Sequence, residues 1–230
     1  MARRKVVFII VEGPSDSEAL GVILTRLLDE NEVHIEIVYE DITTQKGVNP
    51  NNIVSKIGDR VRKYAKIYSL KQSDFQEVIH IIDMDGAYIS DDRIIEKKEL
   101  DKTEYTKSEI YCKRREDIII RNEIKRANID RIYLQPIVWK SVAYKTFFMS
   151  CNLDHVLYDI QNSDDDAKKN NSISFSKKYR DNLDGFIDYI SNSSFSVDLD
   201  YKESWEFIKK ENRSLERYTN FGLWISKHRK

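Results

Sequence analysis

The chain has 230 residues, and its 38 basic and 39 acidic side chains nearly cancel, so net charge neither indicates nor excludes nucleic acid binding. Seven glycines and three prolines are typical of a compact chain, which argues against long disordered tails. Cys112 and Cys151 lack CxxC spacing, which argues against a zinc site or a disulfide framework.

The apolar run VVFIIV stops at Glu12 after six residues, which is too short for the core of a signal peptide. No other run approaches the length of a membrane span. We therefore expect a globular protein in the cytoplasm, with no membrane partner.

The first 85 residues alternate between strand and helix patterns. The run KVVFIIV, which ends at Glu12, predicts a strand covered on both faces. Pro14 begins a predicted helix with leucines and isoleucines on one stripe. Residues 33–40 and 77–83 predict two further strands, and residues 51–68 predict a helix between them. This order indicates an α/β fold with a parallel sheet flanked by helices.

The pattern changes after this unit. Residues 91–131 are more than half charged and predict one or two exposed helices. Residues 131–139 predict another strand, in which Pro136 indicates an edge or a bulge. Residues 161–180 are interpreted as a polar loop, and the aromatic-rich segments from Asn182 onward are interpreted as helices that pack on the sheet.

Carboxylates follow two of the predicted parallel strands. Glu12 follows the first strand, Asp83 and Asp85 close the third, and Asp16 lies one turn into the first helix. Functional groups in such sheets gather at the carboxyl ends of strands, near the switch point of the strand order. Carboxylates meeting there would raise one another's pKa values unless a cation compensated them. Oxygen ligands without histidine or cysteine favour Mg²⁺ or Mn²⁺ over zinc.

A shared ion sets a geometric condition. The carboxylates of Glu12 and Asp83 must lie within about 10 Å of each other, because oxygen ligands bind these ions at short distances.

The segments IIVEGPSD and IIDMDG resemble the TOPRIM fold of topoisomerases, bacterial primases, nucleases that mature ribosomal RNA, and OLD-type nucleases. The resemblance covers roughly residues 5–90, and VEGPSD is most similar to the OLD-type and phage-defence proteins. It implies that Glu12 acts in acid or base chemistry beside the metal and that Asp83 and Asp85 hold magnesium. Asp16 would be an additional ligand in a two-metal arrangement.

The chain departs from the TOPRIM pattern at Ala87, where many members carry a third acidic residue. A basic residue after a later strand assists some relatives. In this chain Lys140 or Lys145 is the candidate for that place.

The resemblance also implies a domain organisation and partners. We expect a TOPRIM-like core at residues 1–145, with a charged insertion at about 90–130, and a helical C-terminal addition at 146–230. The implied activity is hydrolysis of phosphodiester bonds in DNA or RNA, including tRNA, by a metal-dependent nuclease. Related proteins work beside a separate ATPase, so an ATPase partner and a role in phage defence are expected, and a homodimer is left open.

Three basic clusters are candidates for contacts to the nucleic acid backbone: Lys113–Arg115, Lys125–Arg131 and the terminal SKHRK. Acidic residues are interleaved with them, which favours solvated helix faces as the simpler interpretation.

Two other functions remain open. HIIDMDGAY is similar to the first motif of haloacid-dehalogenase phosphatases, in which Asp83 would be the nucleophile and Asp85 the acid or base. That alternative leaves Glu12-Gly13 unexplained. A catalytically inactive TOPRIM module that binds a partner is the third alternative, since the chain has no GxxxxGK[ST] motif of its own.

Overall fold

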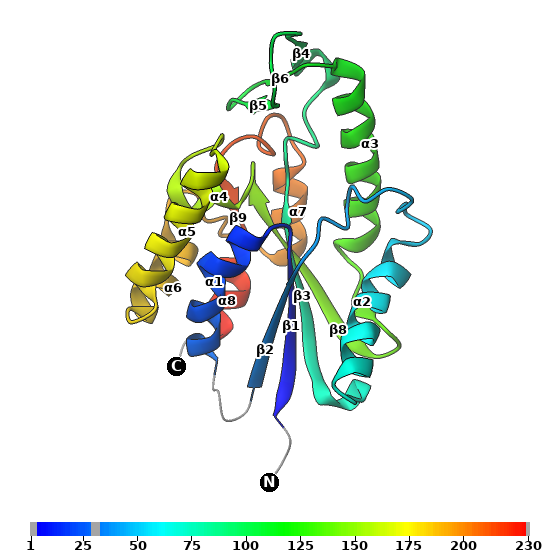
Figure 1. The fold of residues 1–230 in the computed structure, drawn as a ribbon, viewed down its shortest axis with the longest axis vertical. Helices are drawn as coiled ribbons and strands as arrows, with labels where there is room; N and C mark the ends of the chain where they lie inside the picture. Colours follow the sequence, from blue (N-terminus) through cyan, green and yellow to red (C-terminus); the bar gives the residue numbers. More distant parts are fainter. Residues whose placement is uncertain (1–3, 29–32, 229–230) are drawn as a thin grey trace.

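The computed structural model describes residues 4–28 and 33–228. Within these residues six strands form a central sheet in the order β2-β1-β3-β8-β7, with β9 beside β8 (Figure 1). Their bounds are β1 (Lys5–Val11), β2 (Val33–Tyr39), β3 (Phe75–Asp83), β7 (Ile137–Val138), β8 (Val142–Ser150) and β9 (Tyr218–Thr219). The strands β1, β2, β3 and β8 are parallel, whereas β7 and β9 run antiparallel to β8. The predicted α/β fold with a mostly parallel sheet is confirmed.

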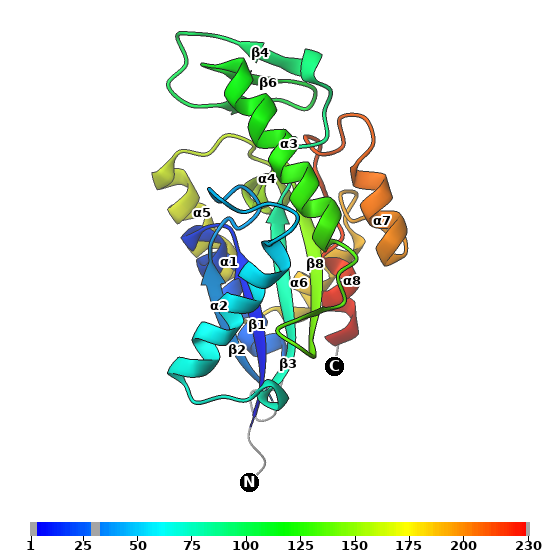
Figure 2. The same ribbon diagram turned by 90° about the vertical axis from the view of Figure 1, so that its right-hand side faces the viewer.

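Helices cover both faces of this sheet. One face carries α1 (Pro14–Leu27), α4 (Leu153–Tyr158), α5 (Asp165–Tyr179), α6 (Leu183–Asn192) and α8 (Gly222–Ile225). The other carries α2 (Ile53–Ile67), α3 (Arg115–Ile132) and α7 (Tyr201–Ile208), as Figure 2 shows from the side. None of the helices in these described segments is long and apolar enough to cross a membrane.

The two helical layers explain the continuous apolar sequence of β1. Its side chains alternate between the faces, so that Val7 and Ile9 pack under α1 while Phe8 and Ile10 pack against α2. All four are buried. A strand with one solvated face would have alternated polar and apolar residues instead.

A small second sheet lies beyond the carboxyl ends of the central strands. It consists of β4 (Ile94–Glu96), β6 (Ile110–Cys112) and β5 (Glu104–Tyr105), in that order. We call residues 94–112 the cap; Figure 1 shows it at the end of the molecule that α3 reaches. Tyr105 of the cap donates its backbone N–H to Asn162 Oδ1 and accepts from Asn162 Nδ2, both at 2.8 Å. The cap is thereby tied to the segment between α4 and α5.

The strand predicted at residues 131–139 is confirmed only at its end, where two residues form the edge strand β7 next to Pro136. The helix α3 continues to Ile132, and β7 contains only Ile137 and Val138. The fourth parallel strand is β8, which follows β7 in the chain. The edge strand β7 pairs with β8 in the antiparallel direction. The boundary placed at residue 145 therefore falls inside a strand of the central sheet.

The polar loop predicted at residues 161–180 is wrong, because residues 165–179 form α5. Asp164 caps this helix by accepting from the backbone N–H of Ala167 at 2.7 Å. Only Phe175 and Tyr179 supply large buried apolar side chains, so the helix has little of the periodic pattern that sequence reasoning uses. The charged insertion likewise holds one helix and the cap, and one face of that helix is buried.

Gly86 joins the end of β3 to the cap segment in a conformation that only glycine adopts freely. Its φ is +68°, and a Cβ there would lie 2.6 Å from Leu215 Cδ2 and 2.9 Å from Ile110 Cδ1. Gly47 offers a matched control, since its φ is +81° but nothing lies within 4 Å of the added Cβ.

We expect both Gly86→Ala and Gly47→Ala to lose about 1 kcal/mol of unfolding free energy for the left-handed backbone. Gly86→Ala should lose a further 1–3 kcal/mol or so, because the new methyl group overpacks its neighbours. Urea denaturation measures both losses. Equal losses in the two variants would contradict the packing described for Gly86.

Candidate functional site

Glu12 and Asp83 meet at the carboxyl ends of β1 and β3, which are adjacent parallel strands. Since β2 lies on the other side of β1, the strand order reverses here, at the place where α/β sheets bind ligands. The backbone N–H of Asp83 donates to Glu12 Oε1 at 3.1 Å. An aspartate carboxylate lies within about 5 Å of its own nitrogen, so the two carboxylates are within about 8 Å of each other. The condition for a shared ion is met.

Asp16 lies at the start of α1 and is 8% exposed. Its Oδ2 accepts from the backbone N–H of Gly13 at 2.8 Å, which satisfies one of the free donors of the helix N-terminus. Burial raises the pKa of Asp16 to about 6, and the charge of Asp154 adds to this, while the hydrogen bond from Gly13 opposes it. Asp16 is therefore both a helix-terminal residue and a member of the site.

Asp85 is held apart from Asp83 by the backbone. Its φ of +47° turns the chain after β3, and its carboxylate forms an ion pair with Lys125 Nζ. The same ammonium group lies 3.2 Å from Glu12 Oε1 and 3.4 Å from Oε2. The Lys125 side chain comes from α3 and is 0% exposed. Glu12 and Asp85 are thus joined through a buried lysine.

The charges of this cluster perturb one another strongly. Burial raises the pKa of Glu12, and the charges of Asp41 and Asp85 raise it further against the opposing effect of Lys125. Burial would lower the pKa of Lys125, but the charges of Asp85, Glu12 and Asp41 outweigh burial and raise it. Lys125 therefore stays charged, and one ammonium group does not neutralise the carboxylates around it.

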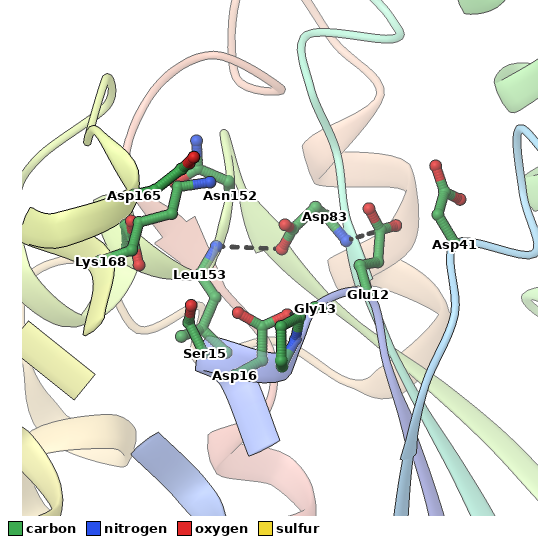
Figure 3. A pocket seen from close by; sticks show the side chains of 12 residues that line it. Glu12, Gly13, Ser15, Asp16, Asp41, Asp83, Asn152, Leu153, Asp165 and Lys168 are labelled. Carbon is green, nitrogen blue, oxygen red and sulfur yellow. Dashed lines mark hydrogen bonds between the residues drawn. The ribbon is translucent and has the colours of Figure 1, made fainter. Parts of the chain in front are cut away.

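Asp83 is half-buried and has the other predicted ligands around it. Burial raises the pKa of Asp83 well above its usual range, and the charges of Glu12, Asp16 and Asp85 add to this. Its Oδ1 accepts from the backbone N–H of Leu153 at 2.9 Å, the contact drawn in Figure 3. Added positive charge at this position would relieve the repulsion.

A pocket of about 470 Å³ opens beside Asp83. We call it the carboxylate pocket, and its lining is Glu12, Gly13, Pro14, Ser15, Asp16, Asp41, Asp83, Asn152, Leu153, Asp154, Asp165 and Lys168. A second hollow of about 490 Å³ shares Asp83, Asn152, Asp165 and Lys168 with it and reaches the cap. The two make one crevice between the central sheet and the cap.

Asp154 is a site residue that the sequence did not indicate. It lies in the first turn of α4, directly after Leu153, and is 5% exposed. Its Oδ2 is buried without a hydrogen-bond partner of regular geometry. Burial raises the pKa of Asp154, and the Ser163 hydroxyl and the charge of Lys168 oppose this rise. It lines the carboxylate pocket together with Asp16 and Asp83. The pattern CNLDHV carries no motif from which this could have been found.

The residues fit a hard divalent cation in one part of the site only. In the described residues no group of three or more histidine, cysteine or acidic side chains is already arranged to hold an ion. Asp16, Asp83 and Asp154 fit by chemistry, because they are carboxylate oxygen donors that line one pocket, and Oδ2 of the buried Asp154 lacks a hydrogen-bond partner of regular geometry. The position between Glu12 and Asp85 does not fit, because the ammonium group of Lys125 lies there.

The lysines considered from the sequence lie elsewhere. Lys145 is paired with Ile79 in the middle of the sheet, four positions before Met149, which pairs with Asp83. That spacing corresponds to about 13 Å along a strand. Lys140 precedes β8 and lies farther still. The lysines that reach the site, Lys125 and Lys168, come from helices instead.

The basic clusters divide between structural and exposed positions. Arg115 donates to the carbonyl oxygens of Ile94 at 3.0 Å and Asp91 at 2.6 Å, so it shapes the cap. Arg114 pairs with Asp117 on the surface. The terminal SKHRK is described only to His228, and its last two residues lie outside the described chain.

Comparisons with models of protein families, with curated protein sequences and with solved structures found no match.

When no divalent ion is bound, the raised pKa of Asp16 makes the free energy of unfolding depend on pH. A folded-state pKa of about 6, against an ordinary value of 3.8, means that the folded chain binds more protons between these values. Stability is therefore lost as the pH rises through this window. Asp16→Asn should be more stable than the natural chain at pH 7, by up to about 3 kcal/mol, and equal to it near pH 4.

Urea denaturation in EDTA at the two pH values measures this difference. Asp198→Asn, an exposed position in the loop before α7, is the matched control and should show no such change. A difference for Asp16→Asn that does not vary with pH would contradict the burial cost assigned to this carboxylate.

Proposed function

We propose that the chain is a TOPRIM-like nuclease that hydrolyses phosphodiester bonds with Mg²⁺ or Mn²⁺. The observation that carries the proposal is the meeting of Glu12 and Asp83 at the ends of two adjacent parallel strands, at the switch point of the sheet. Asp16 and Asp154 line the same pocket. Such a cluster of carboxylates suits a cation and repels a phosphate when no cation is present.

Asp16, Asp83 and Asp154 would hold the ion in this proposal. A bound divalent ion supplies charge stabilisation and a lower pKa for water, which are the two needs of phosphodiester hydrolysis. The hydrogen bond from Leu153 to Asp83 and that from Gly13 to Asp16 fix one oxygen of each carboxylate. The direction of the remaining oxygens is thereby restricted before any ligand arrives.

Glu12 is the proposed acid or base. Its raised pKa brings proton exchange toward neutral pH, where such a group works best. Its contacts with Lys125 and with the backbone N–H of Asp83 orient the carboxylate. Lys168, which lines both hollows, would contact a phosphate of the substrate in this proposal.

The choice between DNA, RNA and tRNA stays a prediction, as do the ATPase partner and the role in phage defence. These rest on the resemblance of the motifs VEGPSD and IIDMDG. The crevice supports only the general class of substrate, because it offers carboxylates for a cation and a lysine for a phosphate.

The test is cleavage of end-labelled DNA and RNA by the purified chain with Mg²⁺, with Mn²⁺ and with EDTA. Glu12→Gln and Asp83→Asn should each reduce metal-dependent cleavage by about 100-fold or more, because the first removes the proposed acid or base and the second removes a proposed ligand of the ion. Asp198→Asn, exposed and remote from the pocket lining, should cleave at the natural rate.

Other outcomes separate the alternatives. Metal-dependent cleavage that survives both substitutions would overturn the assigned site. Hydrolysis of a small phosphate ester that is lost in Asp83→Asn and retained in Glu12→Gln would support the haloacid-dehalogenase alternative. Absence of turnover together with stable binding to an ATPase would support the inactive module.

A further inference from the structure

Lys125 is an unusual residue for the interior of an acidic site. Its side chain is 0% exposed, and it ranks among the largest fully buried side chains of the described chain. An ammonium group carries three donors, and here they face Glu12 and Asp85. Burial of such a charge is tolerated only where it is paired, and this one has two carboxylates as partners.

The helix α3 holds the lysine in this place through a second contact. Arg121, one turn earlier on α3, donates from Nη2 to the carbonyl oxygen of Asp85 at 2.8 Å. The backbone N–H of Asp85 donates to the carbonyl oxygen of Cys151 at 2.7 Å. The segment that carries the Asp85 carboxylate is therefore fixed at its backbone as well as at its side chain.

The ammonium group lies where a second divalent ion would have to bind. An ion shared by Glu12 and Asp85 would need oxygen distances of about 2.0–2.6 Å to both. Lys125 Nζ is already within hydrogen-bonding distance of both carboxylates, and two such cations would overlap and repel each other. The carboxylate pocket, in contrast, is lined by Asp16, Asp83 and Asp154 and does not include Lys125.

We propose that Lys125 acts as a permanent cation between Glu12 and Asp85, so that the centre binds one divalent ion in the carboxylate pocket instead of two. The inference rests on the proposed function, since it concerns the ion which that function needs. It assigns Lys125 as a positioning residue, which orients Glu12 and excludes an ion from the Asp85 side. It also assigns Asp85 to the lysine and not to the metal.

The test is the number of Mn²⁺ ions bound per chain, counted by titration with detection of free Mn²⁺ by electron paramagnetic resonance. The natural chain should bind one ion. Lys125→Met, which shortens the side chain by one atom and removes its charge, should bind two, because Glu12 and Asp85 become free to take an ion. Lys56→Met is the matched control, since Lys56 is exposed on α2 and lines neither hollow, and it should still bind one.

Thermal unfolding gives a second readout that does not need activity. Addition of Mn²⁺ should raise the melting temperature of Lys125→Met more than that of the natural chain, because the ion replaces the lost charge. The double variant Lys125→Met/Asp85→Asn should lose both the second ion and the additional stabilisation. It also covers the case in which Lys125→Met alone fails to fold, because it removes one of the two uncompensated carboxylates.

Two ions bound by the natural chain would overturn the inference, as would an unchanged ion count in a folded Lys125→Met. These outcomes differ from failure of the proposed function. A natural chain that binds one ion but cleaves neither DNA nor RNA would refute the nuclease proposal and leave the role of Lys125 standing. A natural chain that cleaves with two bound ions would do the reverse.

Discussion

The buried ion pairs of Lys125 with Glu12 and Asp85 connect three parts of the chain that are far apart in sequence. Glu12 follows β1, Asp85 follows β3, and Lys125 comes from the middle of α3. Loss of the lysine would leave both carboxylates without this partner, which costs about 3–5 kcal/mol. These charges meet because of the path of α3, the turn after β3 and the attachment of the cap. We regard this as the constraint on which the site depends.

The parallel sheet supplies the rest of the arrangement. Adjacent parallel strands end at the same edge of the sheet, so the strand order alone brings together the residues that follow β1, β3 and β8. Leu153 and Asp154 follow β8 and complete the surroundings of Asp83 on one side, while Glu12 completes them on the other, as Figure 3 shows for the labelled residues. The excess of carboxylates in the pocket lining, with Lys168 at its edge, supports the proposed cation binding and phosphate chemistry.

Sequence reasoning reached the parts of this site that depend on local pattern. The burial of β1 and β3 predicted where Glu12 and Asp83 would lie, because the rule for strand ends needs only the element order. Lys125 could not be placed in the same way, since its position depends on the path of α3 across the sheet and not on periodicity. It was assigned to a solvated basic cluster for that reason. Asp154 was missed because β8 went unrecognised. The first half of β8 alternates buried and exposed residues, while its second half is buried throughout.

A diffraction experiment tests directly whether one ion binds at this edge of the sheet. Crystals soaked in MnCl₂ near neutral pH should show, at the manganese absorption edge, one anomalous peak in the carboxylate pocket among Asp16, Asp83 and Asp154. The same map should show no peak between Glu12 and Asp85, where Lys125 lies. A peak between Glu12 and Asp85, or no ordered ion at this edge of the sheet, would contradict the account.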